Sequence, residues 1–186
     1  MNVTHSGLAD WGLSHVIVGR ADRILDVGCG GGRTVQKLAQ MASDGHVDGV
    51  DYSSASVAVA RRTNADAIAN GHVTVEHGSV SALPFTDRTF DLVTAVETHY
   101  YWPNLEASMR EVLRVLKPGG TFALIAETVK DRQPNPIHRL AMPLLGAAYL
   151  TTNEHTSLLR RAGFVDVVVD TRASGWMCAT AKRPVS

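Results

Sequence analysis

The chain has 186 residues and zero formal net charge, with 18 Lys and Arg against 18 Asp and Glu. Its 45% hydrophobic and 19% charged residues are ordinary for one soluble globular domain that can bury a sizeable core. Because no Lys/Arg cluster is longer than Arg61-Arg62 or Arg160-Arg161, the sequence lacks the electrostatic footprint of a nucleic-acid-binding protein.

Five short β-branched segments are typical of mostly buried strands. They are Ile24–Val27, Val47–Val50, Val73–Glu76, Phe90–Ala95 and Thr121–Ala126.

Helical patterns separate these strands. Thr34–Met41 carries its apolar residues on one face. Ser53 is a suitable N-cap for a helix over Ser54–Asn70, and Gly71 follows where a C-terminal glycine belongs.

Two further helices are predicted toward the C-terminus. Glu106–Leu116 has apolar residues at helical spacing, and Pro118-Gly119-Gly120 is expected to stop it. Thr151-x-x-Glu154 is a capping box that opens a helix over Asn153–Ala162.

The last two strands, Val165–Asp170 and Trp176–Ala181, are joined by a loop too short for a crossover, which predicts an antiparallel hairpin. Residues 128–150 have weak periodicity and contain Pro134, Pro136 and Pro143. They form either a partial lid over a substrate or a surface excursion that completes packing.

This alternation predicts an α/β fold in a single domain, with a mostly parallel sheet of seven strands between two layers of helices. Ligands of such sheets bind outside the carboxyl ends of the strands, near the point where the strand order reverses. Functional residues are therefore expected after the first four strands.

The glycine loop Gly28-x-Gly30-x-Gly32 follows the first strand, with Asp26 just before it. A dinucleotide fingerprint would need a third glycine where Arg33 stands. The second strand ends in Asp51, at a position where a carboxylate can accept both hydroxyls of a ribose. The alternatives are a plain tight turn for the glycines and, for Asp51, an acid that complements the dipole of the next helix.

Three further segments follow the glycine loop in the chain. They are His77-Gly78-Ser79-Val80-Ser81-Ala82-Leu83-Pro84-Phe85, Phe90-Asp91-Leu92-Val93-Thr94-Ala95-Val96 and Arg114-Val115-Leu116-Lys117-Pro118-Gly119-Gly120. Together with the glycine loop, they make the chain from about Arg23 to Ile125 resemble the class I S-adenosylmethionine-dependent methyltransferases.

The resemblance implies a Rossmann-like three-layer αβα sandwich with an antiparallel last strand, and S-adenosylmethionine as cofactor. It implies that Gly28 and Gly30 let the backbone approach the methionyl end, and that Asp26 meets the methionyl amino group. Asp51 would bind the ribose hydroxyls, and Tyr52 would cover one face of the adenine.

The same resemblance places the adenine edge near Ser79 and the backbone N–H of Val80, with Val96 also bordering the cofactor. An Asp often stands in the family where this chain has Ser79, so the side-chain contact there departs from the family pattern.

Methyl transfer needs alignment of nucleophile and methyl group, and a general base only if the nucleophile must lose a proton. Glu97 and His99 are the candidates for a base or an orienting group, although His99 could instead satisfy a backbone group. Tyr100, Trp11 and Tyr149 are candidates to line the acceptor pocket; for Tyr100 and Trp11 the alternative is core packing.

Under this interpretation the chain comprises four segments: 1–22, an N-terminal cap; 23–127, the cofactor-binding core; 128–150, the partial lid; and 151–186, the C-terminal helix and hairpin. The expected function is methyl transfer from S-adenosylmethionine to a small-molecule acceptor. The alternative is a non-catalytic module that binds S-adenosylmethionine as a sensor or scaffold. A nicotinamide oxidoreductase is disfavoured by Arg33 and by the lack of a Tyr-x-x-x-Lys motif.

We further expect a cytoplasmic protein with no membrane or nucleic-acid partner. The N-terminus shows no signal-peptide pattern, and the longest apolar run, Leu140–Leu150, is too short to span a bilayer. Cys29 and Cys178 form no pair motif and are expected to be free thiols, and the eight histidines lack His-x-x-x-His spacing, so no metal site is expected.

Overall fold

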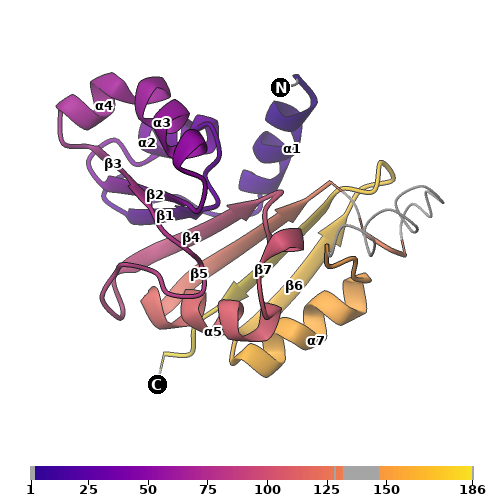
Figure 1. Cartoon of the computed structure of the whole chain (residues 1–186). Coiled ribbons are helices and arrows are strands. Elements are labelled where there is room, and N and C mark those ends of the chain that lie inside the picture. Colours follow the sequence, from indigo (N-terminus) through magenta and orange to yellow (C-terminus); the bar gives the residue numbers. More distant parts are fainter. Residues whose placement is uncertain (1–2, 128, 132–146, 186) are drawn as a thin grey trace.

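A computed structural model describes residues 3–127, 129–131 and 147–185. Seven strands form one sheet in the order β3-β2-β1-β4-β5-β7-β6 (Figure 1). Their bounds are β1 Arg23–Val27, β2 His46–Asp51, β3 Val73–His77, β4 Phe90–Val96, β5 Leu116–Ala126, β6 Val165–Thr171 and β7 Met177–Lys182.

Strands β1 to β5 pair in parallel, whereas β7 runs antiparallel to both β5 and β6. This confirms the mostly parallel seven-stranded sheet with an antiparallel last strand. The strand order reverses between β1 and β4, so a ligand crevice is expected at the carboxyl ends of these strands.

Helices cover both faces of the sheet (Figure 1). Apolar residues on β1 alternate between the two faces: Ile24 packs with Leu38 of α2, and Leu25 packs in the cluster that contains Met109 of α5. One face carries α1 (Val3–Leu13), α2 (Arg33–Met41), α3 (Ser54–Thr63) and α4 (Ala65–Ala69); the other carries α5 (Leu105–Val115) and α7 (Thr152–Ala162). The three-layer architecture is therefore confirmed.

The predicted helix over Ser54–Asn70 is wrong in its length, because the chain breaks at Asn64 into α3 and α4. The buried Asn64 amide donates to the carbonyl oxygens of Gly32, at 3.0 Å, and Ala60, at 2.9 Å. These bonds use both donor positions of the Asn64 side chain at the α3 terminus and attach that terminus to the glycine loop.

The Pro118-Gly119-Gly120 segment was expected to stop the preceding helix, but it lies inside β5. Helix α5 already ends at Val115, and the register of β5 against β4 shifts between the pairs of Phe90 and Leu92. Proline and glycine thus form an irregularity within a longer strand, which fits their exclusion from regular ladders.

The predicted lid over 128–150 falls largely on 128 and 132–146, outside the described residues. The described residues at the two ends of this segment lie next to each other, since the amide of Lys130 donates to the carbonyl of Leu150 at 3.0 Å. The capping box is confirmed: Thr151 and Glu154 bind each other's backbone amides at 3.1 and 2.7 Å. Among the described residues, no helix has the length and apolar character needed to cross a bilayer.

Candidate cofactor and acceptor site

The ends of β1, β2 and β4 meet at the strand-order reversal and bring the candidate residues to one edge. Asp26 on β1 stands in register with Gly49 on β2 and with Thr94 on β4. Parallel pairing therefore places the chain segments that follow these three strands next to one another.

Asp26 is buried, and one of its carboxylate oxygens accepts a 2.6 Å hydrogen bond from the Thr94 hydroxyl. Burial raises the pKa of Asp26, the Thr94 bond opposes this rise and the negative charge of Asp51 adds to it, so that the pKa is about 7. A carboxylate in such a place gains most from a nearby cation, because the cation favours its ionised form.

The glycine loop is fixed to β2, since the amides of Gly28 and Cys29 both donate to the carbonyl of Val50. Gly28 and Gly30 have φ values of 75° and 52°, a region that glycine adopts readily. A Cβ at Gly30 would meet nothing within 4 Å, whereas a Cβ at Gly28 would lie 2.0 Å from the Oγ1 of Thr98. Of these two glycines, Gly30 is the one that faces open space.

Helix α2 begins directly after this loop, and no side chain caps its N-terminus. Free N–H groups and the helix dipole make such a terminus attractive to a carboxylate or other anion. Gly32, the N-cap, has a different role: a Cβ there would come within 2.9 Å of Ala60 in α3. Its small size allows α2 and α3 to pack.

Asp51 links the glycine loop to α3. Its Oδ2 accepts from the amide of Gly30 at 2.8 Å, and its Oδ1 accepts from the amide of Ser53 at 2.9 Å. Because a carboxylate offers about four acceptor positions, these two bonds leave capacity for two hydroxyl donors. Its neighbour Tyr52 is 76% exposed.

The turn at residues 78–85 lies beside Asp51, since the amide of Gly78 donates to the Asp51 carbonyl at 3.0 Å. The exposed Ser79 side chain accepts from the amide of Ser81 at 3.2 Å, and Val80 is buried. The structure therefore brings Ser79 and Val80 together with Asp51, as the family resemblance implied.

Glu97 follows β4 and has a φ of 57°, a rare conformation for a residue other than glycine. Its Oε1 accepts from the hydroxyl of Tyr100 at 3.2 Å and from the amide of Glu127 at the end of β5. Burial raises the pKa of Glu97, the hydrogen bonds from the Glu127 amide and the Tyr100 hydroxyl oppose this rise, and the charge of Glu127 adds to it, so that the pKa is about 7. A strained, half-buried carboxyl beside a strand end is typical of a functional position.

His99 lies in a 3-10 turn (η1, His99–Tyr101) and has no exposed surface. Its Nε2 lies 3.1 Å from the Nε2 of His155 on α7, whose Nδ1 lies 2.8 Å from the Thr151 carbonyl. The carbonyl requires a proton on the Nδ1 of His155, so His155 accepts at Nε2 and His99 donates. Burial lowers the pKa of His99 well below its ordinary range. These surroundings favour a packing role over that of a proton acceptor.

Two of the three candidates for the acceptor wall, Tyr100 and Tyr149, lie near each other, and Trp11 lies apart from them. Tyr100 is buried beside Glu97, and its carbonyl accepts from the amide of Ala148 at 2.7 Å, which brings the segment of the half-buried Tyr149 alongside η1. Trp11 is 8% exposed and packs elsewhere, with its ring 6.0 Å from that of Trp176.

Three residues of this region gave no signal in the sequence. Thr94 holds Asp26, Thr98 packs against Gly28 and accepts from Trp102 Nε1, and His155 pairs with His99. Val96, named beforehand, is half-buried and pairs with Ile125 of β5. Within the part of the chain that the structure describes, no group of three or more His, Cys, Asp or Glu could hold a metal ion.

Comparison with known proteins identifies the family of the chain. Residues 24–120 match the family model described as a methyltransferase domain. Demethylmenaquinone methyltransferase of Symbiobacterium thermophilum is 42% identical over 102 residues, which cover 54% of this chain but only 41% of that protein. The uncharacterized methyltransferase YdaC of Bacillus subtilis is 25% identical over 190 residues, covering 100% of this chain and 97% of that protein.

Solved structures share the fold. Geranyl diphosphate methyltransferase, solved in complex with S-adenosylmethionine, superposes with a TM-score of 0.79 at 19% identity and covers 96% of this chain and 85% of that chain. The family match spans the glycine loop, Asp51 and the strands that carry them. The chain therefore belongs to the class I S-adenosylmethionine-dependent methyltransferase family, whose cofactor is S-adenosylmethionine.

Proposed function

We propose that the protein transfers a methyl group from S-adenosylmethionine to a small-molecule acceptor held beside Glu97 and Tyr100. The observation that carries the proposal is the convergence of Asp26, Gly30 and Asp51 at one sheet edge, next to the strained Glu97. Each of these groups suits a different part of the cofactor or its reaction.

The residues present fit the cofactor at three points. Open space at Gly30 and the uncapped start of α2 suit the methionyl carboxylate. The carboxyl of Asp26 suits the amino group, and the spare acceptor positions of Asp51 suit the ribose hydroxyls. Tyr52, Ser79, Val80 and Val96 would border the adenine and the rest of the nucleoside.

When bound, the cofactor supplies a methyl group that is already electrophilic. The chain then needs chiefly to hold the acceptor in line and to exclude water. Glu97, with its pKa near 7, orients the acceptor or takes its proton at neutral pH. Tyr100 fixes the Glu97 carboxyl through its hydroxyl and forms part of the pocket wall with Tyr149.

A small acceptor is favoured by the zero net charge and by the names of the relatives. The matched proteins include a demethylmenaquinone methyltransferase and a 27-O-demethylrifamycin SV methyltransferase, each named for a small-molecule substrate. Because the chain spans 41% and 38% of those two proteins, their acceptors do not transfer to it. A cytoplasmic location remains part of the proposal.

The test has two steps. Calorimetry with S-adenosylhomocysteine should first show saturable binding to the purified protein. Incubation with S-adenosylmethionine carrying a labelled methyl group and a small-molecule extract should then yield a labelled product. Binding without transfer to any fraction would favour the alternative of a non-catalytic sensor or scaffold, and absence of binding would reject the cofactor assignment for this chain.

A further inference from the structure

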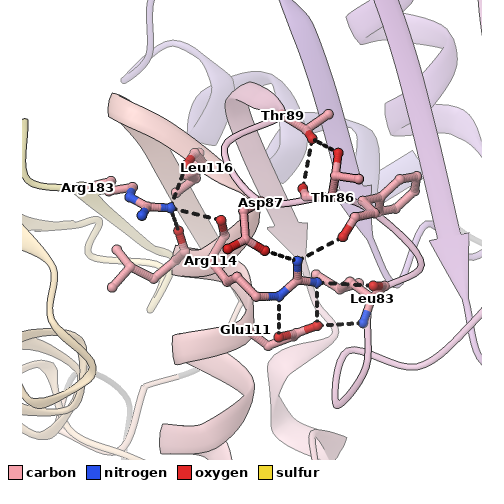
Figure 2. A network of polar contacts seen from close by, with 10 residues as sticks. Leu83, Thr86, Asp87, Thr89, Glu111, Arg114, Leu116 and Arg183 are labelled. Atoms are coloured by element: carbon pink, nitrogen blue, oxygen red, sulfur yellow. Dashed lines mark hydrogen bonds and ion pairs between the residues drawn. The ribbon is translucent and has the colours of Figure 1, made fainter.

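A dense polar network joins α5 to the 78–85 turn, at the end of the turn opposite to the one bonded to Asp51. Figure 2 shows Arg114 of α5 reaching into the loop between β3 and β4. Its Nε and Nη2 each donate to a carboxylate oxygen of Glu111 at 2.8 Å. This bidentate pair of hydrogen bonds fixes the orientation of both side chains.

The same guanidinium binds the loop at three places. Its Nη2 donates to the Leu83 carbonyl at 3.2 Å, and its Nη1 donates to the Phe85 carbonyl at 2.8 Å and to Asp87 at 2.7 Å. Glu111 completes the contact by accepting from the amide of Leu83 at 2.8 Å. Both backbone groups of Leu83 are thus bonded to the Arg114–Glu111 pair.

Only a short stretch of the turn separates Leu83, which this pair binds, from Ser79. The Ala82 amide donates to the Ser79 carbonyl at 3.1 Å, and the Ser81 amide donates to the Ser79 hydroxyl at 3.2 Å. At its other end, the turn is attached to Asp51 through the amide of Gly78. A shift of Leu83 would therefore be transmitted over four residues to Ser79 and Val80.

We propose that Arg114 and Glu111 are positioning residues for the cofactor, which set the place of Ser79 and Val80 without touching the cofactor themselves. This inference rests on the proposed function, because it assigns Ser79 and Val80 to the adenine. Val80, Leu83 and Phe85 anchor the turn in the apolar core, and the polar pair adds the hydrogen bonds that fix the backbone of Leu83 and the carbonyl of Phe85. The cofactor meets a turn that is already ordered, so binding does not have to order it.

Arg183 offers a matched control in the same network. It also inserts a guanidinium next to α5, and Figure 2 shows it on the far side of Arg114. Its Nη1 donates only to carbonyls at the end of that helix and the start of β5, those of Leu113, Arg114 and Leu116. Arg183→Lys should therefore lower stability without moving the 78–85 turn.

The experiment compares Arg114→Lys, Arg183→Lys and the wild type by calorimetry, at a temperature where thermal melting shows all three folded. Two probes are used: S-adenosylhomocysteine, and methylthioadenosine, which lacks most of the methionyl end. Arg114→Lys should bind both probes about tenfold more weakly, because the displaced turn loses contacts at the adenine end, whereas Arg183→Lys should stay within about twofold of the wild type.

Wild-type affinity in Arg114→Lys, or an equal loss in Arg183→Lys, would overturn the proposal and leave the pair a purely structural role. If Arg114→Lys does not fold, Glu111→Gln takes its place with the same expectation, since it keeps the shape and one acceptor oxygen. A wild-type protein that binds neither probe would instead refute the proposed function.

Discussion

Thr98 occupies the space that a side chain at Gly28 would need. A Cβ at position 28 would lie 2.0 Å from the Thr98 Oγ1 and 2.6 Å from its Cβ. The loop after β1 and the segment after β4 can approach this closely only because residue 28 has no side chain. Gly28 and Gly30 therefore have different tasks, although they stand in one motif.

Gly28→Ala and Gly30→Ala should separate those tasks. Gly28→Ala should lower the free energy of unfolding by several kcal/mol, from overpacking and positive-φ strain together. Gly30→Ala carries only the positive-φ strain of about 1–2 kcal/mol, but its methyl group enters the open space and should abolish cofactor binding. Urea unfolding and calorimetry on both variants check this. Normal cofactor binding by Gly30→Ala would show that the loop faces another way.

Asp51→Ala should weaken binding of S-adenosylhomocysteine by about 1.5–3 kcal/mol, the value of hydrogen bonds to a charged group. The structure adds a stability effect, since Asp51 also accepts from the amides of Gly30 and Ser53. Asp51→Asn keeps one acceptor oxygen and should therefore lose less cofactor affinity and less stability than Asp51→Ala. Calorimetry that finds Asp51→Ala binding as tightly as the wild type would remove Asp51 from the site.

Cofactor binding should be linked to the ionisation of Asp26. With its pKa raised to about 7, the free carboxyl is largely protonated at pH 6, and an amino cation beside it would favour the ionised form. Affinity should therefore rise from pH 6 to pH 8, by up to about tenfold per pH unit below 7, with a proton released on binding.

Calorimetry in buffers of different ionisation enthalpy measures that proton. Asp26→Asn should abolish the dependence, and Glu97→Gln should retain it although the pKa of Glu97 is also near 7. If the cofactor affinity of the wild type does not change with pH, Asp26 does not bind the amino group of the cofactor.

Glu97→Gln should leave affinity for S-adenosylhomocysteine nearly unchanged but lower turnover on the true acceptor. If Glu97 takes a proton, turnover falls by a factor on the order of ten to ten thousand, and the limb of the pH–rate profile near pH 7 disappears. An orienting role lowers turnover and keeps the limb. Tyr100→Phe, which removes the hydroxyl bonded to Glu97, serves as the milder companion.

His99→Gln should flatten the acid side of the stability profile. The folded state holds His99 neutral well below its ordinary pKa of 6.5, so the unfolded chain binds more protons once the pH falls below about 6.5. Stability contributed by His99 is therefore present above that pH and is lost as the pH falls, by up to about 1.4 kcal/mol per pH unit.

Asp26 and Glu97 change the pH dependence of stability in the direction opposite to His99. Their raised pKa values contribute stability at low pH that is lost as the pH rises through about 7. The comparison is therefore made between wild type and His99→Gln, by urea unfolding at pH 7 and pH 5. An identical pH difference in the two proteins would contradict the neutral buried state of His99.

The sequence by itself determined the strands, the glycine loop and Asp51 at the end of β2, because these follow from local properties. Runs of β-branched residues favour strands, glycine alone adopts positive φ readily, and a strand end in a parallel sheet fixes where a carboxylate stands. The capping box of Thr151 and Glu154 was equally local and therefore equally predictable.

Tertiary structure decided what depends on partners far away in the chain. Thr94 reaches Asp26 across 68 residues, and His155 reaches His99 across 56, so neither pair leaves a pattern within one segment. The same holds for the break of α3 at Asn64, where a bond to Gly32 spans 32 residues and overrides helix propensity. Local chemistry thus fixed which residues are proposed to face the cofactor, and packing between distant segments fixed their ionisation and position.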